Sequence, residues 1–318
     1  MLLDRMKLNR FLVLGRAGMD LYADPPGTRT EAARRFSAAL GGSAANIAAA
    51  ITRLGGAAAL VSAVSDDAVG RFTVNELQRF GIGTEHVRAV GGEARTSLAV
   101  VETRSDNCQS VIYRNGAADF QIGAEHVRGI DYDDFGALIV TGTCLAIEPS
   151  RASTLLAIGL ARTAGLPVIF DIDYRPYSWA SAEDAAKIYR HATALCDIVV
   201  GNDEEFAIMA GGDGLALART LTAAIAIYKM GGKGSITISE GLSFETGIFH
   251  VTALKPTGAG DAFMGAFVTG LAAGLDLRVC VRRGSAAAAI VVTRVGCAPA
   301  MPESSELDTF MATHSGPK

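Results

Sequence analysis

The chain of 318 residues is 49% hydrophobic and carries a formal net charge of −4, with a sequence pI near 5.8. This length can bury a large core in one α/β domain or in a domain with an appendage. The mixed acidic and basic residues exclude the basic footprint of a nucleic-acid binder, and the apolar run at 286–292 is far shorter than the ~20 residues of a membrane span. The expected partners are small molecules, without nucleic acid or membrane.

The spacing of the cysteines and the absence of several known motifs exclude further classes of protein. The five cysteines lack CxxC spacing and are odd in number, which favours reduced thiols in a cytoplasmic protein over disulfides or a zinc site. The chain also lacks a GxxxxGKS/T phosphate loop, a GxGxxG fingerprint and an HExxH pair. The common nucleotide-binding and metalloprotease signatures are therefore excluded.

Short apolar runs alternate with helical patterns along most of the chain. This alternation predicts an α/β fold with a parallel sheet and helices on both of its faces. The predicted strands are 11–14, 59–64, 137–140, 167–170, 198–200, 225–228 and 235–239. Two segments, about 22–38 and 95–121, instead alternate polar and apolar residues without an intervening helix pattern. We expect them to pair as a small antiparallel sheet, a lid over one edge of the main domain.

A first glycine-rich helix start lies at 41–56, with Ser43 as the expected cap and glycines at the end. Ile47, Ile51 and Leu54 form its predicted buried face. Asn46 lies in the first turn, where backbone can approach a polyhydroxy ligand and the amide can both donate and accept. A ligand role for Asn46 and a purely structural one both stay open.

Polar residues follow several predicted strands, at the edge where open parallel sheets bind ligands. Asp20 comes soon after the first strand, 171–175 reads Asp-Ile-Asp-Tyr-Arg, and 202–205 reads Asn-Asp-Glu-Glu. Each group could instead be an ordinary loop or a helix cap. Between the last two predicted strands, the glycine-rich segment 231–234 is expected to form a turn that touches the edge of a nucleotide.

A second glycine-rich helix start reads Thr257-Gly-Ala-Gly-Asp261, before a helical stretch at 262–270. Backbone N–H groups at a helix start lack intrahelical partners and attract anions. The two glycines let a phosphate approach, and Asp261 in the first turn would point its carboxylate into the same place. The segment suits attack of a hydroxyl on a phosphoryl group. In isolation, a capping aspartate with a glycine turn is the competing interpretation.

The GG-x-x-x-N helix start, the N-x-x-E after a middle strand and the late GAGD helix occur in this order. Together they resemble the ribokinase-like carbohydrate kinase family, also called the phosphofructokinase B family, over nearly the whole of 1–318 as a single kinase domain. The resemblance implies a Rossmann-like, mostly parallel sheet with a β-sheet lid, ATP as phosphoryl donor, and Mg²⁺. Lids of this family occur in open monomers or as dimer clasps, so a homodimer through the lid stays open.

The resemblance also implies roles for the residues at matching positions. Asp261 would be the base that activates the acceptor hydroxyl, while Asn202 and Glu205 would organise the phosphates and the magnesium ion, Glu205 through water. The implied anion hole consists of the N–H groups of Gly258, Ala259 and Gly260. The implied nucleotide contacts are Lys229, Gly231, Gly234 and Ser285. The implied acceptor contacts are Asp20, Gly42 and Asn46.

One departure from the family pattern precedes the second helix start. Lys255-Pro256 stands where many members have Asp-Thr. The base is untouched by this difference, but any monovalent-cation site is put in doubt.

Four further segments, 15–21, 113–119, 171–179 and 198–206, resemble the branch of the family that phosphorylates the 6-hydroxyl of a keto-deoxy-gluconate in myo-inositol breakdown. A carboxylate-bearing acceptor calls for guanidinium groups, whose planar fork binds it bidentately. The candidate substrate arginines are Arg16, Arg114 and Arg175, although each could form a structural ion pair instead. We therefore predict an acidic sugar.

Two alternatives accompany that prediction. Kinases of 2-keto-3-deoxygluconate have a similar arginine-bearing strand end, usually with asparagine in place of Asp173. A sugar-binding sensor without catalysis belongs to another class, and the intact Asp261 with its glycines argues against it.

Overall fold

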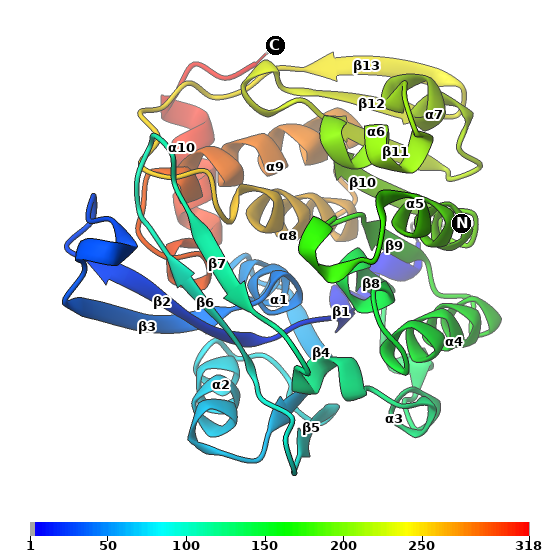
Figure 1. Cartoon of the computed structure of the whole chain (residues 1–318). Helices are drawn as coiled ribbons and strands as arrows, with labels where there is room; N and C mark the ends of the chain where they lie inside the picture. The colour runs from blue at the N-terminus through cyan, green and yellow to red at the C-terminus, as the bar shows by residue number, and fades with distance from the viewer. Residues whose placement is uncertain (1–3, 318) are drawn as a thin grey trace.

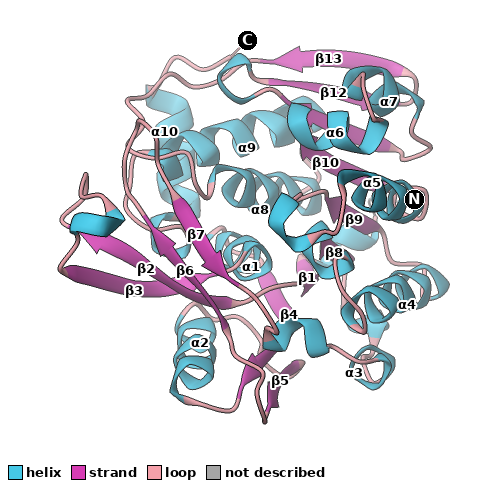
Figure 2. Ribbon diagram, in the orientation of Figure 1, coloured by secondary structure: helices cyan, strands magenta, loops and turns pink. Residues whose placement is uncertain are grey.

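The computed structural model describes residues 4–317. Its main body is a nine-stranded sheet with helices on both faces, and a four-stranded sheet stands at one side of it (Figure 1, Figure 2). The order in the main sheet is β13-β12-β11-β10-β9-β8-β1-β4-β5. Its strands are β1 (Arg10–Leu14), β4 (Ala57–Ser65), β5 (Val87–Val90), β8 (Ala137–Thr141), β9 (Val168–Asp171), β10 (Ile198–Asn202), β11 (Ile225–Lys229), β12 (Ser235–Ser239) and β13 (Leu242–Thr246).

All seven strands predicted from the apolar runs are confirmed, whereas β5 and β13 at the two edges were missed. Every neighbouring pair from β11 across to β5 is parallel, but β12 and β13 run antiparallel. The prediction of a mostly parallel sheet is therefore confirmed, with an antiparallel edge formed by β12 and β13. The connection between β11 and β12 is the short glycine-rich turn, and a parallel return would need a much longer crossover.

Alternate residues of each central strand enter two separate cores. On β1, Phe11 and Val13 face one core, while Leu12 and Leu14 face the other. The first core is covered by α1 (Ser43–Arg53), α2 (Ala68–Arg79), α8 (Ala259–Ala272) and α9 (Leu277–Val292), with α10 (Ser304–Thr313) packed outside α9. The second is covered by α3 (Ala124–Arg128), α4 (Ser150–Thr163), α5 (Ala182–Thr193), α6 (Asp203–Ala210) and α7 (Gly214–Thr220). Burial on both faces explains why these strands read as continuous apolar runs.

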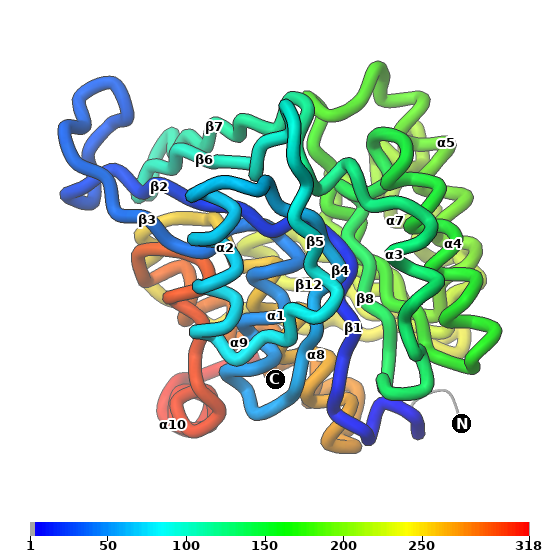
Figure 3. The backbone as a smooth tube through the Cα atoms, turned by 90° about the horizontal axis from the view of Figure 1, so that it is seen from below, coloured from blue at the N-terminus to red at the C-terminus, as the bar shows by residue number. Residues whose placement is uncertain are grey.

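The small sheet, here called the lid, has the order β3-β2-β6-β7, and its β2–β3 hairpin reaches beyond the main body (Figure 3). Its strands are β2 (Gly18–Asp24), β3 (Arg35–Gly41), β6 (Ser97–Val101) and β7 (Ser110–Tyr113). The β2–β3 and β6–β7 pairs are antiparallel, but β2 and β6 are parallel. The purely antiparallel prediction was wrong because the chain passes through α1, β4, α2 and β5 before β6, a connection long enough for a parallel return.

The cysteines and the helix lengths add two structural facts. All five cysteines are free, and four of them are buried. Burial raises the pKa of the Cys144 thiol to about 12, which makes it unreactive at neutral pH. Within residues 4–317, no helix has both the length and the apolar character needed to cross a bilayer.

Candidate active site

A cavity of about 120 Å³ lies between the lid and the ends of the central strands. The lid contributes Asp20 and Tyr22 from β2 and residues of β6 and β7, while α1 and α8 close the other side. The predicted site residues that line this cavity, here called the acceptor pocket, are Arg16, Asp20, Gly42, Asn46, Arg114, Arg175, Gly258 and Asp261. Residues that are far apart in the sequence are thus brought to one place.

Helix α8 begins at the edge of this pocket. Its N-cap is Gly258, with φ of 84°, a left-handed conformation that glycine adopts without strain. Within the described residues 4–317, the N–H groups of Gly258, Ala259 and Gly260 donate no hydrogen bond to protein. A β-carbon added at Gly260 would lie 3.4 Å from the Lys229 Nζ atom. Three free N–H groups and an ammonium group therefore surround a space suited to an anion.

Asp261 occupies the first turn of α8, where it accepts a hydrogen bond of 2.8 Å from Asn46 Nδ2. Burial raises the pKa of the Asp261 carboxyl to about 7, and the charge of Asp173 adds to the rise. The Asn46 hydrogen bond and the charges of Arg175 and Lys229 act in the opposite direction. A carboxyl group with a pKa near neutrality is well matched to accept a proton from a hydroxyl.

Helix α1 starts differently from the prediction. Its N-cap is Gly42, with φ of 100°, and no side chain caps the helix, so the predicted Ser43 cap was wrong. Because Gly42 takes the cap position, Ser43 becomes the first helical residue and its hydroxyl lines the acceptor pocket. The predicted buried face of Ile47, Ile51 and Leu54 is confirmed. This start directs Asn46 toward Asp261.

Several buried polar atoms of the acceptor pocket make no hydrogen bond in the described part of the chain. They are Asp20 Oδ1, Ser43 Oγ, Asn46 Oδ1, Asp173 Oδ2 and Thr257 Oγ1. The second oxygen of Asp20 accepts a hydrogen bond of 3.0 Å from the Tyr22 hydroxyl, which orients the carboxylate. Leaving a buried acceptor unpaired costs roughly 1–3 kcal/mol. These atoms are therefore suited to ligand hydroxyl groups that would supply the missing hydrogen bonds.

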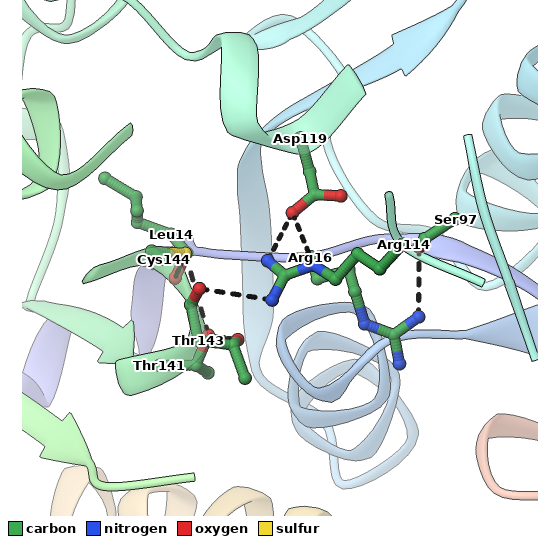
Figure 4. Close-up of polar contacts among 8 residues, drawn as sticks. All are labelled: Leu14, Arg16, Ser97, Arg114, Asp119, Thr141, Thr143 and Cys144. Carbon is green, nitrogen blue, oxygen red and sulfur yellow. Dashed lines mark hydrogen bonds and ion pairs between the residues drawn. The ribbon is translucent and has the colours of Figure 1, made fainter. Parts of the chain in front are cut away.

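Two of the three predicted arginines have carboxylate partners within the protein. Arg114 forms a buried ion pair with Asp119 and donates a hydrogen bond of 3.2 Å to the Thr143 carbonyl (Figure 4). Arg175 lies 2.7 Å from Asp173. Much of the bonding capacity of both guanidinium groups is thus used by the protein, as the structural interpretation of these arginines expected.

Arg16 differs from Arg114 and Arg175 in its hydrogen-bond partners. Its side chain is only 8% exposed, and Nη1 donates one hydrogen bond of 3.0 Å to Ser97 Oγ (Figure 4). Among residues 4–317, no carboxylate lies within ion-pair distance of it. The charge of Arg16 acts to lower the pKa of Asp20 and of Asp173, which line the same pocket. A buried guanidinium group that forms no ion pair is suited to an anionic ligand.

Two buried carboxylates at the end of β9, Asp171 and Asp173, were given no binding or catalytic role from the sequence. Burial raises the pKa of Asp171 to about 8, against the charge of Lys229, and the nearby Asp173, Glu205 and Asp261 add to the rise. Although burial opposes it, Arg175 holds the pKa of Asp173 below its usual value. The signal in the sequence was the Asp-x-Asp pattern directly after a buried strand, which brings two carboxylates to one sheet edge.

Asn202 and Glu205 form a capping box at the start of α6. Asn202 Oδ1 accepts from the Glu205 N–H at 2.8 Å, and Glu205 Oε2 accepts from the Asn202 N–H at 2.7 Å. The alternative that Asn202 is a helix N-cap is therefore confirmed. Glu205 Oε1 also accepts from the Tyr174 N–H, and burial raises the pKa of Glu205. Both residues border a larger hollow that shares Arg175 with the acceptor pocket.

The remaining predicted nucleotide contacts do not line the acceptor pocket. Gly231 begins the turn after β11, with open space around it. Gly234 ends this turn, where a β-carbon would lie 2.1 Å from the Thr246 carbonyl oxygen. Ser285 on α9 donates a hydrogen bond of 3.1 Å to the Gly247 carbonyl. Gly234 and Ser285 therefore both lie next to the segment at the end of β13, Thr246 and Gly247.

Comparison with known proteins gives relatives along nearly the whole chain. A 5-dehydro-2-deoxygluconokinase from Photobacterium profundum is 40% identical over 312 residues, which cover 95% of this chain and 94% of that protein. A 5-dehydro-2-deoxygluconokinase 2 from Bacillus cereus is 37% identical over 311 residues, with 94% of each chain covered. The similarity thus includes both glycine-rich helix starts and the lid.

A solved fructokinase with bound ATP from Xylella fastidiosa matches with a TM-score of 0.85 at 26% identity, over 96% of this chain and 98% of that one. A fructokinase double mutant from Vibrio cholerae, bound to fructose, ADP and potassium ion, has the same TM-score and identity, with 95% and 97% covered. The model of the pfkB family carbohydrate kinases matches residues 9–304. Together with the relatives in sequence, this match shows that the chain belongs to the pfkB family of carbohydrate kinases.

Proposed function

We propose that this carbohydrate kinase transfers the γ-phosphoryl group of ATP to the 6-hydroxyl of 5-dehydro-2-deoxy-D-gluconate, a step of myo-inositol catabolism in the cytoplasm. The names of the two sequence relatives described above support this substrate, because those proteins match nearly the whole chain at 37–40% identity. The products are ADP and the 6-phosphorylated acid. The observation that carries the acidic substrate is the buried Arg16, which forms no ion pair within the part of the chain that the structure describes.

The proposed chemistry uses the start of α8. Asp261 accepts the proton of the 6-hydroxyl while the hydroxyl oxygen attacks the terminal phosphorus atom. The N–H groups of Gly258, Ala259 and Gly260 stabilise the negative charge on the transferred group. Lys229, whose ammonium group lies close to Gly260, contributes a further positive charge there. The unpaired Asp20 and Asn46 oxygens hold acceptor hydroxyls.

ATP and Mg²⁺ are part of the same proposal. Among residues 4–317, no cluster of three or more histidine, cysteine or carboxylate groups has the arrangement of a metal site. This fits Mg²⁺, which keeps several waters and is held mainly by substrate phosphates and one or two carboxylates. Each Glu205 oxygen accepts one backbone N–H and retains a lone pair for a metal-bound water. When bound, Mg²⁺ would neutralise phosphate charge.

The test is an ADP-release assay with 5-dehydro-2-deoxygluconate, 2-keto-3-deoxygluconate, ribose and fructose. We expect the highest kcat/KM with 5-dehydro-2-deoxygluconate. A higher value with 2-keto-3-deoxygluconate would contradict the assignment within the acidic sugars, and a higher value with ribose or fructose would contradict the acidic substrate. Turnover with none of the four would favour a sugar-binding sensor.

The variant Arg16→Ala tests how the acid is recognised. Losing a hydrogen-bonded charge pair of about 1.5–3 kcal/mol predicts a fall of roughly 10- to 100-fold in kcat/KM for the acidic sugar. A neutral sugar with measurable turnover should lose much less. Arg128→Ala, on the exposed surface of α3, is the matched control. Equal losses with both kinds of sugar would mean that Arg16 does not bind the carboxylate.

We also propose a homodimer through the lid. The face of the lid that points away from the acceptor pocket carries Leu21, Val100 and Val111 side by side across three strands, with Phe36 and Tyr113 exposed nearby. Exposed apolar sheet faces of this kind mark protein interfaces. Val111→Glu should shift the mass measured by light scattering from dimer to monomer. A monomeric parent protein would contradict the proposal.

A further inference from the structure

Lys255 is a lysine side chain with 0% exposure, just before the start of α8. Its Nζ atom donates hydrogen bonds to the carbonyl oxygens of Thr257, at 2.5 Å, and Val291, at 3.3 Å. Within the described residues, no carboxylate lies within ion-pair distance of it. A fully buried ammonium group is rare unless it has a carboxylate partner, so its carbonyl partners need an explanation.

The two carbonyl groups belong to segments that meet at the anion hole. Val291 lies in the last turn of α9, where unsatisfied carbonyl groups give a helix end a partial negative charge. Thr257 immediately precedes Gly258, the N-cap of α8. A β-carbon added at Gly258 would lie 3.2 Å from Val291, so the two segments are in contact. The ammonium group therefore fixes the anion-hole loop to the end of α9.

Burial and the neighbouring groups act on the pKa of the Lys255 ammonium in opposite directions, and burial has the larger effect. Burial lowers the pKa of the Lys255 ammonium, and Cys297, Asp261 and Asp20 oppose this change. Asp20 and Asp261 both line the acceptor pocket, so the positive charge also balances two carboxylates beside the reacting groups. Main-chain carbonyl oxygens at a helix end would serve a free monovalent cation equally well. Here a covalently attached cation uses them.

We propose that the Lys255 ammonium is a tethered cation that holds the anion-hole loop in place, so that phosphoryl transfer needs no free monovalent cation. This inference rests on the proposed role of the Gly258–Gly260 loop in phosphoryl transfer, but not on the identity of the sugar. Lys255 acts as a positioning residue, because its Nζ atom bonds the loop carbonyl rather than a reacting atom. The potassium-bound fructokinase described above is the natural protein for comparison.

The first test needs no variant. The kcat of the parent protein, measured with Mg²⁺ and whichever sugar it phosphorylates, should agree within about twofold in potassium chloride and in choline chloride of equal ionic strength. The fructokinase serves as the parallel measurement. A strong increase of the parent protein's kcat with potassium would overturn the inference.

The second test removes the tethered cation. Lys255→Ala leaves a carbonyl-lined space, and we expect its kcat to fall ~100-fold in choline chloride, as for loss of an anion-hole contact. Potassium, ammonium or a short alkylammonium ion should restore much of the activity, since each can occupy that space. Lys255→Met fills the same volume without charge and should not respond. Lys187→Ala, on the exposed surface of α5, is the control.

A melting experiment separates this inference from the proposed substrate, because it uses no sugar. Potassium should raise the Tm of Lys255→Ala relative to choline, by mass action on the folded state, and should leave Lys255→Met and the parent protein unchanged. If Lys255→Ala keeps full activity in choline, or if Lys255→Met is as active as the parent protein, Lys255 is not a tethered cation. If no cation changes the Tm or kcat of Lys255→Ala, the inference also fails.

Discussion

The starts of helices α1 and α8 are alike in their N-cap residue, but their surroundings differ. Each helix has a glycine N-cap at positive φ, 100° at Gly42 and 84° at Gly258, and neither start has a side-chain cap. The two helices pack against each other, and the Asn46–Asp261 hydrogen bond joins their first turns. In the sequence, both starts were interpreted as places where a ligand could approach the backbone.

The two glycine N-caps differ in the atoms that an added β-carbon would meet. The Ala45 N–H of α1 donates to the Arg16 carbonyl at 3.3 Å, and a β-carbon at Gly42 would lie 2.3 Å from the same oxygen. At α8, a β-carbon on Gly258 would meet the Cys297 side chain at 3.0 Å, and the N–H groups of Gly258, Ala259 and Gly260 have no protein partner among residues 4–317. A methyl group at Gly42 would therefore meet backbone, whereas one at Gly258 would meet side chains.

The largest expected effect is that of Asp261→Asn. Asparagine has the same shape but cannot accept the hydroxyl proton, so kcat should fall by ~10³-fold or more. The Tm should hold or rise slightly, because the substitution removes a buried carboxyl whose pKa is raised. Steady-state kinetics and thermal melting check both parts. Turnover near that of the parent protein would contradict the proposed base.

A matched pair of glycine substitutions tests the comparison directly. Gly42→Ala should lower the free energy of unfolding by ~2–4 kcal/mol, because the methyl group meets backbone that cannot move aside. Gly258→Ala should lower it less, since the Cys297 side chain can shift, but should reduce kcat ~10- to 100-fold by disturbing the anion hole. Denaturant unfolding and kcat are measured for both. The reverse ranking would show that the two starts do not differ as described.

The pH dependence of kcat/KM should report the Asp261 carboxyl in the unliganded protein. Since burial raises its pKa to about 7, the base form is lost as the pH falls below this value. The value of kcat/KM should then decrease ~tenfold per pH unit, with an apparent pKa that belongs to the coupled carboxylates. A profile that is flat down to pH 5 would contradict this assignment.

The main sheet could be predicted from the sequence because each central strand, buried on both faces, reads as an apolar run. Both helix starts were found for a similar local reason, since glycines and short polar residues mark them. The hydrogen-bond or ion-pair partner of each charged group was harder to predict from the sequence. Arg114 and Asp119 are five residues apart, yet nothing in the sequence shows that Arg16 lacks such a partner or that Lys255 is buried. Those facts depend on contacts between distant segments, such as Arg16 with Ser97 and Lys255 with Val291.

The smallest expected effect is a shift of the acid limb of the pH profile in opposite directions in two variants. Asn46→Ala removes a hydrogen bond that favours the charged carboxylate, so the apparent pKa of Asp261 should rise. Asp173→Asn removes a negative charge that disfavours it, so the apparent pKa should fall. We expect each shift to be about one pH unit or less, since these contributions act beside burial, which is the largest cause. Both variants also change acceptor binding and therefore the value of kcat/KM. The comparison uses only the apparent pKa of the acid limb. Shifts of the same sign would mean that a group other than Asp261 controls the reaction below pH 7.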